Sequence, residues 1–532
     1  MSRTPLFRTL RRALAVARRA ERTGVEPSDL LGRLSETALS RRRLLTAAGT
    51  AAVGLAAAGR RPLLAADRPT ASGEVAVVGA GVAGLTCAWR LRQAGVRVRV
   101  FEAQGRVGGR MLSLRGGFPE GQVCELGGEL VDTGHVAIRA LSAELGLELD
   151  DFEQDDPAMA REVWFFEGRR IREEEVVAAF RPLAPRIDAA WEGLAGDDVT
   201  HRSPNGGEAI DRMSIAEWLE REGIRGWFHR LLEVAYVTEY GLEIDRQSAW
   251  NLLALIGTAP DRFAVFGESD ERFHIRGGND QVPLRLAERL GDAVVRGHRL
   301  EAVRPASDGG FRLSFRAAGR SVDVGARQVV LALPFTLLRD VDLAVELSPG
   351  KRRAIAELGY GTNAKLMVGY AERLWRTRGG SNGSVLSDLP FQLVWESTRL
   401  QPGRGGILVH YSGGLRGLET GVGTPAEQAK ASTRELERVF PGLETLRGQE
   451  ARFHWPTHEW ARGSYACYQP GQWTGLRGLE GEPEGSLHFA GEHTSLDFQG
   501  YMEGGCESGE RAAREVLAGL GLPVPPMPAS GE

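Results

Sequence analysis

Two short apolar stretches near residue 80 have the length and composition of buried strands, and a helical stretch separates them. Residues 74–78 read EVAVV and residues 96–101 read VRVRVF, whereas residues 85–93 carry apolar positions at helical spacing. Later stretches at 299–303 and 329–333 also predict strands. Strands joined by a helix are the unit of a Rossmann-type α/β domain, and the pattern predicts such a domain.

The middle of the chain has a different pattern. Residues 131–270 are mostly helical in periodicity, and Ser214 with Glu217 predicts the capped start of one helix. Residues 364–368 predict another apolar strand, and residues 507–520 predict a C-terminal helix. We therefore expect a second region of mixed sheet and helices, of the α+β type, interleaved in sequence with the Rossmann-type domain.

Composition and charge exclude several classes of protein. The 532 residues are 42% hydrophobic and 26% charged, which is ordinary for a globular chain with room for two domains. The net charge is −4, but residues 1–66 carry +9, so the remainder carries −13. An acidic body argues against binding to nucleic acid. The four cysteines show no paired spacing, so neither a zinc site nor a disulfide framework is indicated.

The basic N-terminal segment has the features of an export signal. Residues 41–43 are three arginines, followed by a mildly apolar run at 46–58 that is too short for a stable membrane span of about 20 residues. This arrangement resembles a twin-arginine signal, with cleavage at 56–58 or 65–66. We expect export to the periplasm or the extracellular space. A basic surface tail, with residues 6–20 lying on a membrane as a helix, is the alternative.

The first motif with chemical content is the turn after the first predicted strand. Gly79, Gly81 and Gly84 form a GxGxxG pattern between strand and helix, and Glu102 follows 18 residues after the third glycine. Such a turn lets the backbone approach a pyrophosphate at the helix N-terminus, and the acid receives ribose hydroxyls. A glycine-rich turn with no ligand is the alternative.

Four further motifs carry a resemblance to a known family. They are GRVGGR at 105–110, ELGG at 125–128, RGSY at 462–465 and FAGE at 489–492, followed by the stretch FQGYMEGG. With them the chain resembles the flavin-containing amine oxidases, of the monoamine oxidase and L-amino-acid oxidase type, over about residues 74–518. Phytoene desaturases and protoporphyrinogen oxidase begin similarly, so the N-terminal motifs alone do not choose the reaction.

The resemblance implies FAD as the cofactor. The cofactor-binding residues that it implies are Gly79, Gly81, Val82, Ala83, Gly84, Glu102, Ala103, Arg110, Gly127, Gly128, Leu300, Glu492, Gly500 and Met502. Monoamine oxidases link the flavin through the cysteine before the first active-site tyrosine. Here that residue is Ser464, and Cys467 is three places away, so we expect non-covalent FAD.

Lys365 is the first of three candidate catalytic residues. The chain has only three lysines, and this one lies within an apolar strand, where an unpaired cation is costly. In the family a lysine at this place holds a water beside flavin N5 and assists reoxidation by dioxygen. A lysine on an edge strand, reaching out to water, is the alternative.

Tyr465 and Tyr501 are the other two candidates. In the resemblance they face each other across the substrate amine, and both count as substrate-binding residues. The backbone from Gly500 to Met502 passes close to the flavin pyrimidine ring, where a helix N-terminus stabilises the negative charge of the reduced flavin. Two tyrosines packed in the core under a helix are the alternative.

Glu129 bears on the choice of substrate. L-Amino-acid oxidases carry an arginine for the substrate carboxylate close to this point, whereas this chain has Glu129 and Leu130. An anion there favours a second cationic group on the substrate and repels a carboxylate. We expect an FAD-dependent amine oxidase that transfers hydride from a primary or secondary amine to flavin N5 and reduces dioxygen to hydrogen peroxide.

Three other functions stay open at this point: an L-amino-acid oxidase, with basic amino acids as one possible substrate, a desaturase-like flavoprotein, and a non-catalytic FAD-binding scaffold. Formation of a homodimer also stays open. The predicted domains are an export segment at 1–66, an FAD-binding domain at 74–130, 271–335 and 480–520, a substrate-binding domain at 131–270 and 336–479, and a tail at 521–532.

Overall fold

The predicted strand–helix–strand unit forms the centre of a parallel sheet. The structure is a computed structural model that describes residues 75–259 and 263–527, so the predicted export segment lies outside the described residues. Helix α3 (Val82–Gln93) links two parallel neighbours, β1 (Val75–Val78) and β2 (Val98–Phe101). The five strands of this sheet are, in order, β20 (Leu487–Phe489), β13 (Gln328–Leu331), β1, β2 and β9 (Val294–Val295).

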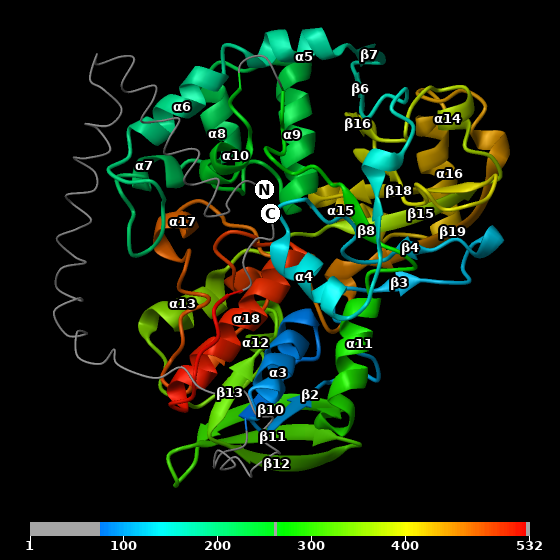
Figure 1. Cartoon of the computed structure of the whole chain (residues 1–532). Helices are drawn as coiled ribbons and strands as arrows, with labels where there is room; N and C mark the ends of the chain where they lie inside the picture. Colours follow the sequence, from blue (N-terminus) through cyan, green and yellow to red (C-terminus); the bar gives the residue numbers. More distant parts are fainter. Residues whose placement is uncertain (1–74, 260–262, 528–532) are drawn as a thin grey trace, which may run out of the picture. The chain divides into compact units, whose positions relative to one another are not determined.

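Helix α18 (Met502–Gly519) packs against α3 beside this sheet, and Figure 1 shows the two helices side by side. Their close approach depends on small residues. A Cβ at Gly505 would lie 2.7 Å from Val82 Cγ1, and a Cβ at Gly509 would lie 2.4 Å from the Ala83 oxygen. The helix begins at Met502 and not at residue 507, because packing against α3 outweighs the low helix propensity of its glycines.

A second sheet lies against the first. Its four strands are, in order, β12 (Arg320–Ala326), β11 (Phe311–Ala317), β10 (His298–Pro305) and β14 (Asp342–Leu343). The rings of Phe101 at the end of β2 and Phe315 in β11 stack with their centroids 4.6 Å apart, which joins the two sheets. The predicted strand at 299–303 is therefore confirmed as part of a longer one.

The predicted strand at 364–368 belongs to a separate seven-stranded sheet. Its strands are, in order, β19 (Arg447–His454), β15 (Ala364–Tyr370), β18 (Gly406–Ser412), β17 (Leu393–Glu396), β16 (Val385–Ser387), β6 (Val163–Phe166) and β7 (Arg169–Ile171). Strand β15 pairs with β19 on one side and β18 on the other, and all seven of its residues are buried. The alternative that Lys365 lies on an edge strand is therefore wrong.

Helices are the main secondary structure of residues 131–270, as the periodicity predicts. They are α4 (Val136–Glu144), α5 (Glu173–Phe180), α6 (Ala184–Glu192), α7 (Glu208–Asp211), α8 (Ile215–Arg221), α9 (Gly226–Tyr240) and α10 (Ala249–Leu255). The predicted cap of α8 is confirmed, because the Glu217 backbone N–H donates to Ser214 Oγ while the Glu217 carboxylate accepts from the Ser214 backbone N–H.

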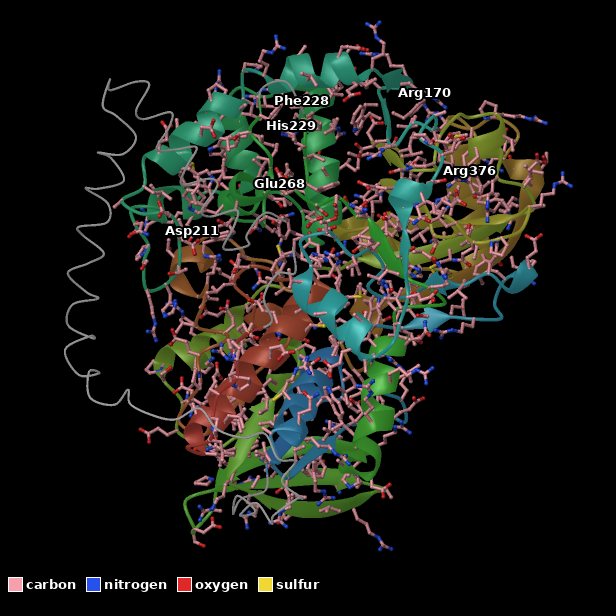
Figure 2. The ribbon with its side chains drawn as sticks, in the orientation of Figure 1. Arg170, Asp211, Phe228, His229, Glu268 and Arg376 are labelled. Carbon is pink, nitrogen blue, oxygen red and sulfur yellow. The ribbon has the colours of Figure 1, made fainter. Side chains whose placement is uncertain are left out.

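Asp211, labelled in Figure 2, links separate segments of this helical region through hydrogen bonds. Its carboxylate accepts hydrogen bonds from Ser248 Oγ at 2.8 Å and from Thr474 Oγ1 at 2.7 Å. Ser248 precedes α10, and Thr474 lies in α17 (Gln472–Gly475). A fully buried carboxylate with several donors holds distant segments in place.

The remaining elements connect these parts. The short strands are β3 (Ser113–Leu114), β4 (Cys124–Glu125), β5 (Leu149–Asp151) and β8 (Phe273–Ile275). The remaining helices are α11 (Gln281–Leu290), α12 (Phe335–Leu338), α13 (Pro349–Glu357), α14 (Leu374–Thr377), α15 (Gly414–Thr420) and α16 (Pro425–Leu436). The fold is thus α/β, with a Rossmann-type sheet interleaved along the chain with mixed sheet and helices; the domain boundaries themselves stay a prediction. Within residues 75–259 and 263–527, no helix is long and apolar enough to cross a membrane.

Candidate active site

One cavity of about 350 Å³ receives residues from both the Rossmann-type sheet and the seven-stranded sheet. Of the predicted site residues, only Gly84 does not line it. Those that do are Gly79, Gly81, Val82, Ala83, Glu102, Ala103, Arg110, Gly127, Gly128, Glu129, Leu300, Lys365, Tyr465, Glu492, Gly500, Tyr501 and Met502. The cavity thus runs from the glycine-rich turn to the two tyrosines.

The glycine-rich turn forms the nucleotide end of the cavity. Gly79 has a φ of 104°, and a Cβ there would lie 2.5 Å from the Ala332 oxygen. A Cβ at Gly81 would meet nothing within 4 Å, because this residue opens to the cavity. Gly81 precedes α3 without a side-chain cap, so the N-terminus of the helix is open to an anion.

Gly84 permits close packing of α3 on the turn. A Cβ at this position would lie 2.0 Å from the Gly79 oxygen and 3.2 Å from the Ala332 side chain. This packing alone requires a glycine, and Gly84 does not line the cavity. Contact of Gly84 with the cofactor stays a prediction.

Glu102 closes the nucleotide end. Its two carboxylate oxygens accept hydrogen bonds of 2.8 Å from the backbone N–H groups of Ala80 and Gln104. Burial raises the pKa of Glu102, and these two donors oppose that rise. An acid fixed at the end of β2 beside the open N-terminus of α3 fits the ribose and pyrophosphate of a dinucleotide such as FAD.

Arg110 and Glu492 join the two ends of the cavity. Arg110 Nη1 donates to Glu492 Oε1 and to the Ser464 carbonyl, both at 2.8 Å. The Gly500 backbone N–H donates to the other oxygen of Glu492 at 2.8 Å. These contacts fix the loop before α18 to the wall of the cavity. Direct contact of Arg110 or Glu492 with FAD stays a prediction.

Glycines also permit close approach around residues 127–128. A Cβ at Gly127 would lie 1.8 Å from the Arg110 oxygen, and a Cβ at Gly128 would lie 2.7 Å from Met502 Cγ. Gly500 has a φ of 92° and its Cβ position lies 3.5 Å from the Tyr465 ring. The backbone therefore excludes a side chain at Gly127, a side chain at Gly128 would displace Met502, and the positive φ favours glycine at Gly500.

Lys365 lies in the wall between these segments and is only 4% exposed. Its ammonium group donates to the Glu129 carboxylate at 2.7 Å, to the Gly127 carbonyl at 2.8 Å and to the Glu125 carbonyl at 3.2 Å. The other Glu129 oxygen accepts from Ser397 Oγ at 2.6 Å. Burial alone would raise the pKa of Glu129, but the charge and hydrogen bond of Lys365 hold it below its usual range.

This pairing changes the interpretation of Glu129. The sequence suggested an unpaired anion that would attract a cationic group of the substrate. The structure instead gives each carboxylate oxygen a partner within the protein, and the charge is balanced by Lys365. Glu129 lines the cavity, but its own charge is already compensated.

Tyr465 and Tyr501 reach the same cavity from different segments. The Tyr465 hydroxyl lies 2.7 Å from the Tyr411 hydroxyl and donates to the Thr238 carbonyl at 3.3 Å. The Tyr501 hydroxyl donates to Glu239. Burial raises the pKa of both tyrosines well above 10, so both stay neutral. That the two rings face each other across a substrate stays a prediction.

Four lining residues at this end were missed at the level of sequence: Glu239, Glu271, Trp395 and Tyr411. Of these four, only Glu239 has a sequence feature that could have marked it. It lies in the last turn of α9, where the helix dipole disfavours an acid, and a residue that breaks a local rule often serves a site. The other three depend on contacts between distant segments.

Glu239 and Glu271 are the acids of this end that no cation balances by an ion pair. Burial raises the pKa of Glu239, which its hydrogen bond from Tyr501 only partly opposes. The Glu271 side chain is exposed to the cavity, and the surrounding protein together with the nearby charge of Asp132 raises its pKa to about 8. Within the described chain, no hydrogen bond or ion pair reaches the Glu271 carboxylate.

A Rossmann-type turn that opens into a long cavity, with a buried lysine and two tyrosines at the far end, defines a dinucleotide-dependent oxidoreductase. The model of the family described as flavin containing amine oxidoreductase matches residues 82–517. The chain belongs to this family, and it is therefore an oxidoreductase.

Individual relatives are distant but cover most of the chain. An L-amino acid dehydrogenase of Synechocystis is 24% identical over 472 residues, which cover 86% of this chain and 97% of the relative. Amine oxidase [flavin-containing] A of Bos taurus is 27% identical over 472 residues, covering 84% of this chain and 85% of the relative. The solved structure of cyclohexylamine oxidase from Brevibacterium oxydans has the same fold, with a TM-score of 0.74, 23% identity and coverage of 84% and 99%.

FAD is the cofactor that this family and the residues of the nucleotide end imply. It would be held by the turn at Gly79 to Ala83, by Glu102 and by the segment at Leu300. Ser464 stands at the position of the flavin-linking cysteine, and its hydroxyl donates instead to Asn363 Oδ1 at 2.6 Å. Cys467 is fully buried. FAD is accordingly non-covalent.

Proposed function

We propose that the protein oxidises a primary or secondary amine by hydride transfer to FAD, with dioxygen as the electron acceptor. The amine becomes an imine, which water hydrolyses to a carbonyl compound and an amine or ammonia, and dioxygen becomes hydrogen peroxide. The observation that carries the proposal is the substrate end of the cavity, which we define by Lys365, Tyr465, Tyr501, Glu239 and Glu271. It combines aromatic walls with acids.

The charges at the substrate end favour an amine over an amino acid. Among the described residues that line this end, the only cation is Lys365, and Glu129 already balances it. A free carboxylate on the substrate would meet two acids there, and the nearby cation Arg399, which acts on Glu271, does not line the cavity. An ammonium group would be attracted by Glu239 and Glu271.

These acids also support a finer proposal, that the preferred substrate carries a second cationic group. One amine must be neutral at the flavin to release hydride, so the attraction applies to a second, distal ammonium. Diamines satisfy this requirement. Glu271 replaces Glu129 as the residue to which we assign this recognition, because its carboxylate has no partner within the described chain.

FAD would supply the hydride acceptor, whereas the residues of the chain orient the amine and exclude water from the site. Tyr465 and Tyr501 form apolar walls whose hydroxyls are held by Tyr411 and Glu239. Rings fixed in this way limit the rotation of a bound amine and exclude water from its reacting carbon. No general base is needed for a neutral amine.

L-Amino-acid oxidation is the second candidate. The observation that favours it is the similarity to the L-amino acid dehydrogenase of Synechocystis over 86% of this chain. A basic amino acid would satisfy Glu271 with its side chain, but its carboxylate would still lack a cation among the described residues of the substrate end.

A peroxide-release screen of the purified holoenzyme tests the two candidates. We would compare straight-chain diamines, monoamines of equal length, basic L-amino acids and neutral L-amino acids. Diamines are expected to give the highest kcat/KM, followed by monoamines. Faster turnover of neutral L-amino acids than of any amine would contradict the proposal in favour of the second candidate.

We also propose that residues 1–66 direct export through a twin-arginine pathway. The support is the arginine triplet at 41–43 before a mildly apolar run. Determining the N-terminus of the mature protein from its natural source checks this. A cytoplasmic protein that keeps residue 1 would contradict it.

A further inference from the structure

The ammonium group of Lys365 has no proton left for a ligand. An ammonium carries three N–H donors, and the protein supplies three acceptors at 2.7, 2.8 and 3.2 Å. Two of them are backbone carbonyls of the strand and loop at 125–127, which cannot move away without unfolding the cavity wall. The third is the Glu129 carboxylate.

Glu129 is itself fixed. Its second oxygen is held by Ser397 at 2.6 Å, and both side chains of the Lys365–Glu129 pair are only 5% exposed. Lys365 lies in β15 and Ser397 directly follows β17, so two strands of the seven-stranded sheet position the ion pair. A buried pair with good hydrogen-bond geometry keeps a single arrangement.

The pair also cancels the field of the lysine. At a distance of several ångströms, a cation and an anion separated by 2.7 Å act as a dipole, whose effect falls off much faster than that of a single charge. A group in the cavity therefore experiences far less positive charge than an unpaired lysine would supply.

We propose that Glu129 is a positioning residue that attenuates the effect of Lys365 on dioxygen, so that the reduced cofactor reacts with dioxygen more slowly than it would beside an unpaired lysine. The inference rests on the proposed function in one respect, that FAD occupies the cavity. Dioxygen takes two electrons and two protons and leaves as hydrogen peroxide, so negative charge develops on oxygen during the reaction. An unpaired ammonium would stabilise that charge, whereas the paired one has neither a net field nor a donor to offer.

The decisive measurement is the reoxidation rate of photoreduced holoenzyme mixed with dioxygen at pH 7. Photoreduction needs no amine, so the result does not depend on whether the proposed substrate is right. The wild-type rate is the reference against which the Glu129 variants are compared in the same buffer.

The substitution Glu129→Gln keeps the shape of the side chain and removes the negative charge. We expect its reoxidation by dioxygen to be about tenfold faster than that of the wild type. The double variant Glu129→Gln/Lys365→Met should lose this gain, because it no longer has the Lys365 ammonium that Glu129→Gln leaves unpaired. An unchanged or slower rate in Glu129→Gln, with FAD bound, would overturn the proposal.

Two readouts separate this role from a general structural effect. Reoxidation by a ferricenium dye, which needs no proton donor, should change less than about twofold in Glu129→Gln. The midpoint potential of the bound FAD should rise in the same variant, since an uncovered cation stabilises the more negative reduced form. A falling potential, or equal acceleration with dye and dioxygen, would contradict the assignment.

Discussion

Two groups of charged side chains line the same cavity, and they differ in how the protein balances their charge. Near the middle, Glu129 is paired with Lys365 and supported by Ser397. Toward the far end, the Glu271 carboxylate has no hydrogen bond or ion pair within the described chain, and Glu239 accepts a hydrogen bond from the Tyr501 hydroxyl.

The pKa values of these acids differ because a cation offsets the effect of the surrounding protein at Glu129 but not at Glu271. The charge of Lys365 holds the pKa of Glu129 below its usual range, although burial acts in the opposite direction. The pKa of Glu271 rises to about 8, because burial and the charge of Asp132 outweigh the attraction of Arg399. One cavity therefore contains an acid whose pKa is lowered and an acid whose pKa is raised to about 8.

The difference indicates separate roles. A fully compensated pair has no capacity for a ligand, so its effect is on the geometry and field of the wall. An uncompensated acid in a ligand-sized cavity gains stability when a cation arrives from outside. The predictions below perturb one group while leaving the other intact.

The largest effect is expected from Lys365→Met, which leaves the Glu129 charge buried without its cation. Removing one partner of a buried ion pair costs about 3 kcal/mol or more in the free energy of unfolding. Urea unfolding of the FAD-saturated protein at pH 7 measures this cost. The double variant Lys365→Met/Glu129→Gln should recover most of it, because no unpaired charge remains.

The sign of the pH dependence gives an independent check on this pair. The pKa of Glu129 is lowered in the folded protein, so its contribution is present above its unfolded pKa and is lost as the pH falls through the folded pKa. The stability gap between wild type and Lys365→Met should therefore narrow as the solution is acidified. A gap that is independent of pH would mean that lost packing, and not lost charge, causes the destabilisation.

The nucleotide end of the cavity could be predicted from sequence, and the reason is physical. Gly79, Gly81 and Glu102 belong to one strand–helix–strand unit, in which local turn chemistry fixes the site. Tyr465 and Tyr501 were predicted from resemblance, and the structure brings both to the cavity.

The balance of charge could not be predicted in this way. Lys365 and Glu129 are 236 residues apart in sequence, and only the pairing of strands brings them together. The packing role of Gly84 could not be predicted either, since a local motif does not show which of its glycines serve packing. Glu271 lies before β8 in a segment without any motif, so nothing in the sequence marked it.

A smaller effect is expected from Tyr501→Leu, which keeps bulk but removes the aromatic wall and the donor to Glu239. Aromatic contacts of this kind contribute about 1 kcal/mol, so the rate of flavin reduction by substrate should fall about five- to tenfold. Anaerobic stopped-flow absorbance measures the rate, and the FAD content should be unchanged. Tyr501→Phe is the matched control that removes only the hydroxyl.

Comparison of the two Tyr501 variants distinguishes the contribution of the aromatic ring from that of the hydrogen bond to Glu239. Tyr501→Phe should retain most of the reductive rate, because the ring remains. If Tyr501→Phe is as slow as Tyr501→Leu, the hydrogen bond to Glu239 matters more than the ring, and the aromatic interpretation fails.

The smallest effect is expected from Glu271→Gln, and it concerns selectivity. Solvent reaches Glu271 through the cavity, so its attraction for a distal ammonium is screened and is worth about two- to fivefold in kcat/KM for diamines over monoamines. In the wild type this ratio should rise between pH 7 and pH 9, because the Glu271 pKa is about 8 and only the ionised form attracts the cation. In Glu271→Gln the ratio should be lower and flat. Glu268→Gln, in the same segment but outside the cavity lining and labelled in Figure 2, is the matched control.

The folded pKa of Glu271 is raised, so the stability contribution of its protonated form is present below the unfolded pKa and lost as the pH rises through about 8. Glu271→Gln should therefore unfold at a higher temperature than the wild type at pH 9 and show less advantage at pH 5. A diamine preference that survives in Glu271→Gln would assign the recognition to Glu239, and a wild-type ratio that is flat with pH would remove the acid of pKa about 8 from substrate binding.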